Sequence, residues 1–300
     1  MEYITASSIT ASSLALKPSD QPSSISSSIQ PLNQAIGQAL IIAYRENTDR
    51  LEAVLTFLGF DCEVLRQNDS PEYQDCAATY RCMLNHQRAW KQAAQSDRPT
   101  LIVEADFVPV VGMGNLPLPF NLEQPNVGIC WLYTCAPQVY SLSADGYAEG
   151  FSTGLVAYIL TPEGAATLCG LADQVTEKQG IGYCTFDSDI EKYLRIRGFK
   201  NYIAYRNYGE HGGRSNPEHQ QNGMSGIHRA DVLAGKLAFL PDYASTSSNR
   251  YWHFYQARLY ARLKGIGRLL TGRFLRWKLL RYSKTPDRLL KFAIGRQIVF

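Results

Sequence analysis

The sequence predicts an α/β fold in which helices flank a mostly parallel sheet. Residues 39–44 and 100–103 are short continuous apolar runs, the pattern of strands buried on both faces of a sheet. Between them lie a helical segment, a short strand at 62–65 and a second helical segment. This order is that of βαβ units, which place strands side by side in a parallel sheet.

Local signals set the bounds of the other elements. Capping side chains and prolines mark the starts of helices, and glycine marks an end. Further strands are expected at 127–133 and 155–160. The expected helices run from Asn47 or Thr48 to Gly59, from Pro71 to about residue 98, onward from Pro162, and onward from Asp187 or Ser188.

Composition divides the chain into three segments. Residues 1–36 contain ten serines between Ser7 and Ser28, and they bury too little apolar surface to offset the entropy of ordering. We expect this segment to be disordered. Residues 37–245 are expected to form the α/β domain, and residues 246–300 a basic amphipathic helical tail.

Positive charge is concentrated near the C-terminus. Residues 250–300 contain thirteen Lys or Arg and one acid, Asp287, which gives +12 and leaves −9 for the rest of a chain that carries +3. Aromatic residues lie among the basic ones, as in segments that bind anionic lipid headgroups. We expect the tail to bind an anionic membrane surface. No nucleic-acid partner is expected, because the sequence contains no recognisable nucleic-acid-binding module.

Cysteine usage and hydropathy predict where the protein resides. Seven cysteines form an odd set without CxxC pairs, typical of reduced core residues in a cytosolic protein. No run approaches the ~20 apolar residues that cross a bilayer, and the N-terminus lacks the pattern of a signal peptide. The expected location is the cytoplasm, with peripheral docking at the inner face of a membrane.

Two carboxylates follow the strand at 100–103. Glu104 and Asp106 are one residue apart, so in an extended chain they point to the same side, at the edge where open α/β sheets bind ligands. Carboxylate oxygens suit Mg²⁺ or Mn²⁺, and such an ion can neutralise a departing diphosphate. From spacing alone, two acids that end a strand and face water are the commoner arrangement.

These carboxylates belong to a longer pattern. Residues 81–86 read Arg-Cys-Met-Leu-Asn-His, and residues 101–106 read Leu-Ile-Val-Glu-Ala-Asp. On these residues, and on residues 154–166, the chain resembles glycosyltransferase family 25, which includes lipopolysaccharide-biosynthesis and collagen galactosyltransferases. The family motif is Gly-Cys-x-x-Ser-His followed by a strand ending in Glu-Asp-Asp. This chain departs from it at Arg81, Asn85 and Ala105.

The resemblance covers about residues 38–210. It implies a GT-A-like, Rossmann-type sandwich, a UDP-sugar donor, and Mn²⁺ or Mg²⁺ held by Glu104 and Asp106. It also implies inverting transfer of a hexose such as galactose to a lipopolysaccharide or other surface-glycan acceptor. His86 would lie near the donor and orient it or the metal-binding strand, although a lone helical histidine is more often structural.

Two acids open a predicted helix. Attack by an acceptor hydroxyl needs a carboxylate that takes its proton, and the family has an Asp in this region. Asp187 and Asp189 are therefore both candidates for the catalytic base, and the sequence does not choose between them. A helix N-cap is the alternative interpretation.

Residues 208–219 are rich in turn formers and polar groups. His211 resembles the late metal ligand of several GT-A glycosyltransferases, and Arg214 could contact a phosphate. An ordinary polar loop is an equally good interpretation. The residues that follow the first strand, where the base and ribose of a donor would lie, are Tyr44, Arg45 and Arg50.

The leading functional hypothesis is a metal-dependent hexosyltransferase. A non-catalytic nucleotide-sugar or glycan-binding protein on the same fold is the alternative, and Ala105 is its main support. A metal-dependent phosphoesterase would need more His and Asp ligands than the sequence supplies.

Overall fold

The structure is a computed structural model that describes residues 30–67, 70–214, 217–224, 228–245 and 249–298. The disorder expected for residues 1–29 lies outside the described part of the chain.

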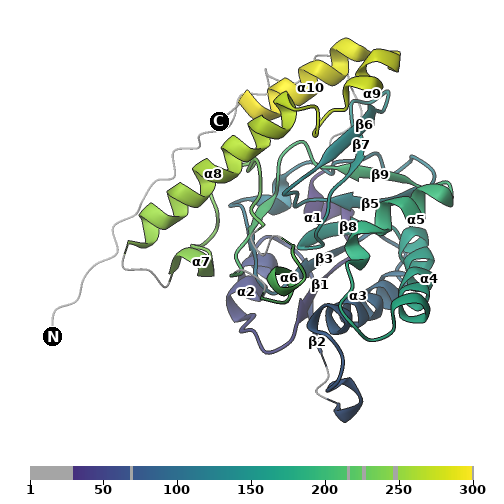
Figure 1. The fold of residues 1–300 in the computed structure, drawn as a ribbon, viewed down its shortest axis with the longest axis vertical. Helices are drawn as coiled ribbons and strands as arrows, with labels where there is room; N and C mark the ends of the chain where they lie inside the picture. The colour runs from purple at the N-terminus through teal and green to yellow at the C-terminus, as the bar shows by residue number, and fades with distance from the viewer. Residues whose placement is uncertain (1–29, 68–69, 215–216, 225–227, 246–248, 299–300) are drawn as a thin grey trace.

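Eight strands form a central sheet (Figure 1). They are β1 (Gln38–Ala43), β2 (Cys62–Arg66), β3 (Thr100–Glu104), β5 (Val127–Trp131), β6 (Gln138–Leu142), β7 (Ala148–Phe151), β8 (Ala157–Leu160) and β9 (Lys200–Ile203). Their order is β2-β1-β3-β8-β5-β9-β7-β6. β8 and β7 run in the direction opposite to that of the other six strands. Six of the eight strands run in one direction, which confirms the predicted α/β fold with a mostly parallel sheet.

Helices cover both faces of this sheet. The helices packed around it are α1 (Leu32–Ala35), α2 (Asp49–Phe57), α3 (Ala78–Ala93), α4 (Pro162–Gln179) and α5 (Ile190–Ile196). Leu40 of β1 belongs to a core cluster with Trp90 of α3, whereas the adjacent Ile41 belongs to a second cluster with Leu51 of α2. Successive residues of β1 are thus buried on opposite faces, which explains its uninterrupted apolar sequence.

Two predicted segments in the first third of the chain differ in the structure. The helix expected from Pro71 is divided into a 3-10 turn, η2 (Pro71–Tyr73), and α3, which begins at Ala78. The expected disorder up to residue 36 is wrong for its last residues, because α1 is ordered and Leu32 and Ile36 are buried. The amide of Leu32 donates to the carbonyl of Leu116 at 2.8 Å. The apolar residues at 32, 35 and 36 have the spacing of a helix. The prediction of disorder overlooked this spacing because it was based on the serine-rich composition of the whole segment.

Five short strands have no clear sequence pattern. β6 and β7 are partly exposed at one end of the sheet, and β9 is short. A separate pair, β4 (Phe107–Pro109) and β10 (Gly209–His211), forms an antiparallel ladder beside the main sheet. Residues 208–219, expected as a loop, contain β10 and the start of α6 (Pro217–Gln221). The remaining short elements are η3 (Met113–Asn115), η4 (Phe186–Ser188) and α7 (Asp242–Ser245).

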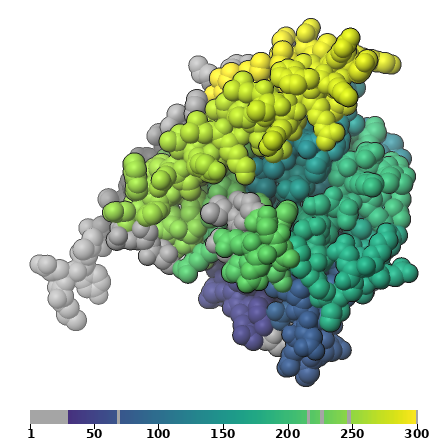
Figure 2. All heavy atoms as spheres, in the orientation of Figure 1, coloured from purple at the N-terminus to yellow at the C-terminus, as the bar shows by residue number. Residues whose placement is uncertain are grey.

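The C-terminal segment packs against the α/β body. Its helices are α8 (Arg250–Leu270), α9 (Trp277–Tyr282) and α10 (Pro286–Ile298), which form a ridge along one side of the molecule (Figure 2). Phe274 and Leu289 are buried in the main core cluster, and the amide of Val139 in β6 donates to the carbonyl of Phe274 at 2.9 Å. The segment is helical and basic as expected, but it completes the core instead of forming a separable tail.

All seven cysteines are free thiols, and four of them, Cys76, Cys130, Cys135 and Cys184, are buried as expected for core residues. Within the described ranges, no helix combines the length and the apolarity required to span a membrane.

A buried ion pair fixes α10 to the body. Arg296 is fully buried, and its guanidinium pairs with Asp231, with one Nη2–Oδ1 distance of 3.0 Å. The same nitrogen donates to Thr134 Oγ1 at 2.8 Å, and Asn207 Nδ2 donates to Asp231 Oδ1 at 2.8 Å. Burial raises the pKa of the Asp231 carboxyl, but Arg296 and the hydrogen bonds that the carboxylate accepts lower it by more. The pKa of Asp231 is therefore below its usual range.

We predict that Arg296→Met lowers the free energy of unfolding by about 3–5 kcal/mol, because it leaves the Asp231 charge buried without its partner. Because the pKa of Asp231 is lowered in the folded state, the stabilisation by the pair is complete above about pH 4 and declines as the pH falls further. Urea unfolding at neutral pH measures the loss. The exposed Lys291 of the same helix supplies the control, Lys291→Met. Equal stability of the two variants would contradict the assignment.

Candidate functional site

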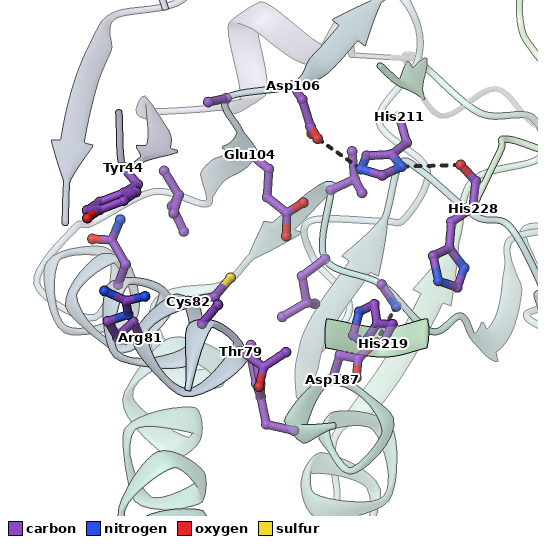
Figure 3. A pocket seen from close by; sticks show the side chains of 18 of the residues that line it. Tyr44, Thr79, Arg81, Cys82, Glu104, Asp106, Asp187, His211, His219 and His228 are labelled. Atoms are coloured by element: carbon purple, nitrogen blue, oxygen red, sulfur yellow. Dashed lines mark hydrogen bonds and ion pairs between the residues drawn. The ribbon is translucent and has the colours of Figure 1, made fainter. Parts of the chain in front are cut away.

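A cavity of about 470 Å³ opens where β1 and β3 end (Figure 3). Its wall includes Tyr44 after β1, Glu104 and Asp106 at the end of β3, Cys82 in the first turns of α3, and Asp187 in η4. This volume lies in the range typical of small-molecule sites, roughly 300–1,000 Å³. The cavity therefore lies at the carboxyl edge of the parallel strands, where the sequence predicts a ligand site.

Three predicted metal ligands meet in this cavity. Candidate ligand atoms of Glu104, Asp106 and His211 all lie within 4.8 Å of one another. Nε2 of His211 is 2.9 Å from Oδ2 of Asp106. Two carboxylates and an imidazole at this separation can coordinate one divalent cation.

Backbone pairing places His211 beside Asp106. His211 is paired with Phe107 in the β4–β10 ladder, and the amide of Gly212 donates to the carbonyl of Asp106 at 2.7 Å. Behind the ladder, Oε1 of the buried Glu210 accepts from the amides of His211 at 3.0 Å and Ala230 at 2.8 Å. The other carboxylate oxygen of Glu210 pairs with Arg258 of α8. The C-terminal helices therefore help to hold the candidate metal ligand in place.

Two observations fit a cation at this position. Oδ1 of Asp106 is buried and has no hydrogen-bond partner among the residues that the structure describes. A buried acceptor without a partner costs roughly 1–3 kcal/mol, and a coordinated cation would remove that cost. In addition, a Cβ at Gly213 would overlap Asp106 Oδ2 and lie 2.9 Å from His211 Nε2. The glycine keeps the space in front of both ligand atoms open.

Electrostatics makes this cluster a site for positive charge. Burial lowers the pKa of the His211 imidazolium, but Asp106 and Glu104 raise it by more, to about 9. Burial raises the pKa of Asp106, but His211 and Arg229 lower it by more. Nδ1 of His211 lies 3.2 Å from the carbonyl oxygen of His228, which can only accept. If Nδ1 of His211 donates to this carbonyl, Nε2 faces Oδ2 of Asp106. Either a proton or a cation must then lie between these two atoms.

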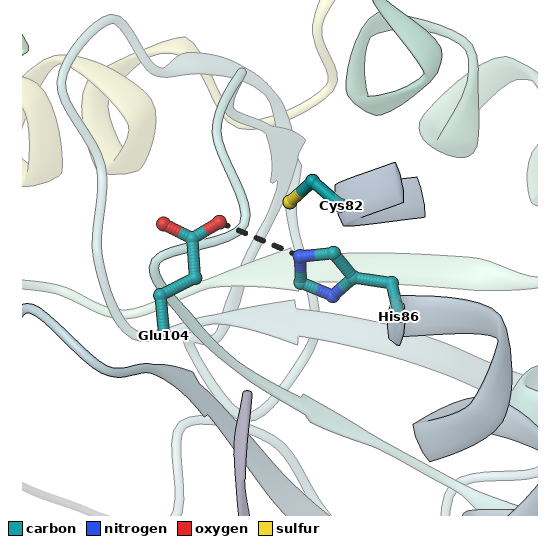
Figure 4. A group of neighbouring side chains, drawn as sticks. All are labelled: Cys82, His86 and Glu104. Atoms are coloured by element: carbon teal, nitrogen blue, oxygen red, sulfur yellow. Dashed lines mark hydrogen bonds and ion pairs between the residues drawn. The ribbon is translucent and has the colours of Figure 1, made fainter. Parts of the chain in front are cut away.

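His86 lies behind the cavity wall and contacts Glu104 (Figure 4). It is fully buried, with Nδ1 2.8 Å from the hydroxyl of Tyr158 and Nε2 3.4 Å from Oε1 of Glu104. Trp90 donates to the same hydroxyl at 2.9 Å, so the Tyr158 proton is directed at Nδ1. The His86 ring then carries its hydrogen on Nε2, and this N–H donates a hydrogen bond to Glu104. His86 does not line the cavity, so direct contact with a donor there is not available to it, whereas the expected orientation of the metal-binding strand fits this chain of hydrogen bonds.

Cys82 completes a second group with His86 and Glu104 whose candidate ligand atoms also lie within 4.8 Å of one another (Figure 4). Burial raises the pKa of the Cys82 thiol well above its usual value, so the thiol stays protonated near neutral pH. A neutral thiol is a poor ligand for a hard cation. The cluster with Asp106 and His211 is therefore the better candidate metal site.

The two candidate bases lie in different places. Asp187 lines the cavity, and its Oδ2 accepts the amide of Gly154 at 2.8 Å. Figure 3 shows it on the opposite side of the cavity from Asp106. Asp189 is exposed, occupies the N-cap position of α5 and lies outside this cavity. The structure therefore distinguishes the two candidate bases, which the sequence could not do: Asp187 lines the cavity and Asp189 does not.

The predicted donor-binding residues also divide into two groups. Tyr44 and Arg214 line the cavity, whereas Arg45 and Arg50 do not. The guanidinium of Arg45 lies 4.8 Å from the centroid of the Tyr44 ring, and that of Arg50 stacks on Phe239 at 4.3 Å. Arg50 is thus held away from the cavity by an aromatic contact of its own.

Several cavity residues have no signal in the sequence. His219 and His228 lie on the wall, with ring centroids 6.0 Å apart. Arg81 also lines the cavity, and its guanidinium lies 5.6 Å from the centroid of the Tyr44 ring. The departure from the family motif at residue 81 thus adds a positive charge beside the predicted donor site. Only the fold brings these residues together, because their spacing follows no local period.

Comparison with known proteins gives a distant structural likeness. No family model matches the chain, and no curated protein matches it significantly. A solved structure described as a glycosyltransferase involved in the glycosylation of the major capsid of PBCV-1 is similar, with a TM-score of 0.37 and 11% sequence identity. The likeness covers 56% of this chain and 83% of that chain. A likeness at this level carries no argument about activity, so the function must rest on the site itself.

We predict that Gly213→Ala lowers Mn²⁺ affinity about 10-fold or more, because the added Cβ would occupy the space at the ligand atoms of Asp106 and His211. No ligand is removed by this change. Isothermal titration calorimetry measures the affinity. Gly235→Ala is the control, since a Cβ there meets nothing within 4 Å. Unchanged Mn²⁺ binding by the folded Gly213 variant would rule out this metal position.

We further predict that Tyr158→Phe weakens Mn²⁺ binding by about 10–100-fold, because it removes the hydroxyl that fixes the His86 tautomer and hence the orientation of Glu104. The matched control is Tyr80→Phe, which removes another hydroxyl of the same core that contacts Thr176 and not His86. If both variants bound Mn²⁺ as the wild type does, the chain of hydrogen bonds would have no role in the site.

Proposed function

We propose that the protein is a metal-dependent glycosyltransferase that moves a hexose from a UDP-sugar donor to a glycan or glycolipid acceptor. The observation that carries this proposal is that a cluster of hard cation ligands and a separate carboxylate line one cavity at the carboxyl edge of the sheet. These are the two parts that sugar transfer from a nucleotide diphosphate requires: positive charge for the leaving group and a base for the acceptor.

Glu104, Asp106 and His211 are the proposed ligands of Mn²⁺ or Mg²⁺. When bound, the cation would neutralise charge on the diphosphate leaving group. His86 would hold the Glu104 carboxylate in orientation, and Gly213 would keep room for the ion in front of Asp106. These roles use the orphaned Asp106 oxygen, which no described protein group satisfies.

Asp187 is the proposed catalytic base. It would take the proton of the acceptor hydroxyl as that oxygen forms a bond to the anomeric carbon. The bond from the anomeric carbon to the diphosphate would break, and the nucleoside diphosphate would leave with the electron pair. A direct displacement of this kind inverts the anomeric carbon. The hydrogen bond from the amide of Gly154 would hold the carboxylate in place on the acceptor side.

The nucleotide would lie near the end of β1. Tyr44 and Arg81 offer an aromatic ring and a guanidinium for a uracil base, and Asn85 joins the ends of β1 and β2 beneath them through bonds to Ala43 and Leu65 of 3.2 and 3.0 Å. Arg214 is exposed on the cavity wall and could bind a phosphate. Galactose as the hexose and lipopolysaccharide or another surface glycan as the acceptor follow from the family resemblance.

A non-catalytic nucleotide-sugar or glycan-binding protein is the second candidate. Ala105, which lines the cavity, stands where the resembled family has a carboxylate, so the site has one negative charge fewer. Such a protein would bind donor and cation without turnover. The presence of Asp187 across the cavity favours the enzyme, because binding alone does not need a base there.

We predict that Asp187→Asn lowers transfer turnover by roughly 10² or more while donor affinity stays within a few-fold, as expected when a general base is removed. Asp189→Asn is the control and should keep wild-type turnover, because residue 189 is exposed outside the cavity. The assay uses whichever UDP-, GDP- or CMP-sugar gives the largest Mn²⁺-dependent rise in melting temperature.

Two results would count against this account. Full turnover in the Asp187 variant would exclude it as the base. Donor binding by the wild type with no measurable transfer or hydrolysis would instead favour the non-catalytic candidate.

A further inference from the structure

The outer face of α8 carries an exposed apolar stripe. Large side chains recur there at spacings of three and four residues, so they lie on one side of the helix. Trp252 is 68% exposed, Leu259 60% and Leu270 72%. The helix has 21 residues and is therefore about 30 Å long. The stripe consists of Trp252, Tyr255, Leu259, Leu263 and Leu270, with the half-buried Ile266 between the last two.

The opposite face of α8 is fixed to the body, which sets the direction of the stripe. Ala261 and Gly265 are buried, and a Cβ at Gly265 would come within 3.1 Å of Gln297 in α10. Arg258 on this side pairs with the buried Glu210 and donates to the carbonyl of Ala230 at 2.8 Å. The apolar stripe thus points away from the protein and not into its core.

Exposed positive charge accompanies the stripe. Five of the thirteen basic residues are engaged with the body: Arg296 and Arg258 in ion pairs, and Arg262, Arg268 and Arg288 with the carbonyls of Gln297, Ala136 and Ala144. The other eight are exposed, against one exposed acid, Asp287. These eight are Arg250, Lys264, Arg273, Arg276, Lys278, Arg281, Lys284 and Lys291.

The short helix α9 repeats the same combination. Trp277 and Tyr282 are 59% and 79% exposed, and Lys278 and Arg281 are exposed on the same short helix. Tryptophan and tyrosine place an apolar ring and a polar tip at the boundary between headgroups and acyl chains. Basic side chains can bind lipid phosphates while their alkyl stems remain in apolar surroundings.

We propose that the outer faces of α8 and α9 form a docking surface for an anionic lipid bilayer. The apolar stripe would enter the headgroup region, and the exposed Lys and Arg would contact lipid phosphates. A second copy of this chain is disfavoured as the occupant, because it would bring two strongly positive surfaces together. Nucleic acid could pair with the charge but has no use for an aliphatic stripe of this length.

This surface differs from the tail that the sequence predicts as a segment outside the α/β domain. Phe274 is buried and Phe292 packs against Tyr205, with ring centroids 5.2 Å apart, so neither can enter a membrane. Removal of residues 250–300 would also remove part of the core. Point substitutions on the exposed faces of the full chain are therefore the suitable test, and they do not depend on the catalytic assignment.

Co-sedimentation with vesicles measures the binding. The full chain should bind vesicles of phosphatidylcholine mixed with phosphatidylglycerol, bind phosphatidylcholine alone weakly, and lose affinity at high salt. Leu259→Asn combined with Leu263→Asn should lower binding to the anionic vesicles about 10-fold or more. Lys278→Gln combined with Arg281→Gln should also lower it, by several-fold, because two charges that would contact lipid phosphates are lost.

The control replaces two apolar residues that are more exposed than Leu259 and Leu263 but lie on other helices, Phe57→Asn with Ile196→Asn, at 89% and 67% exposure. This variant should bind vesicles as the wild type does. Equal loss in the control and the stripe variant, or equal binding to neutral and anionic vesicles, would overturn the proposal. So would a concentration-dependent dimer, or nucleic-acid binding without vesicle binding, that the stripe substitutions abolish.

Discussion

Asp106 and His211 are in contact, and together with Glu104 they form a cluster that needs positive charge among its ligand atoms. Much of the surrounding structure supports this cluster. Asp106 and His211 come from distant parts of the chain, and the β4–β10 ladder holds them together by backbone pairing. Glu104 adds a second carboxylate to the same group. Such a cluster, placed at the edge of a buried sheet, is stable only if a proton or a cation lies among its oxygen and nitrogen atoms. The bare Gly213 and the orphaned oxygen of Asp106 favour the cation.

Support for this cluster extends through much of the molecule. On one side, Trp90, Tyr158 and His86 form a buried chain of hydrogen bonds that ends on Glu104. On the other, Arg258 of α8 neutralises Glu210, which binds the amide of His211. The C-terminal helices thus have two faces with different roles. Their inner side stabilises the candidate metal site and the core, whereas their outer side carries the exposed apolar and basic residues.

Strongly periodic segments could be predicted from the sequence, and so could the position of the cavity. Continuous apolar runs gave β1 and β3 because a strand buried on both faces has no polar positions. The short strands β7 and β9 could not be predicted, since they pair with each other, and β9 pairs with β5, across long stretches of sequence. For the same reason spacing could not choose between Asp187 and Asp189, or show that His86 lies behind the cavity wall. The packing of the C-terminal segment against the body could not be predicted. Composition shows its positive charge but not that Arg296 forms a buried ion pair with Asp231.

The central claim is that one divalent cation binds among Glu104, Asp106 and His211. Diffraction from crystals grown with MnCl₂, recorded at the manganese absorption edge, tests it most directly. The account predicts a single strong anomalous peak within coordinating distance of these three residues, roughly 2.0–2.3 Å from their oxygen and nitrogen atoms. A peak elsewhere, or no peak in crystals of a protein that binds Mn²⁺ in solution, would contradict it.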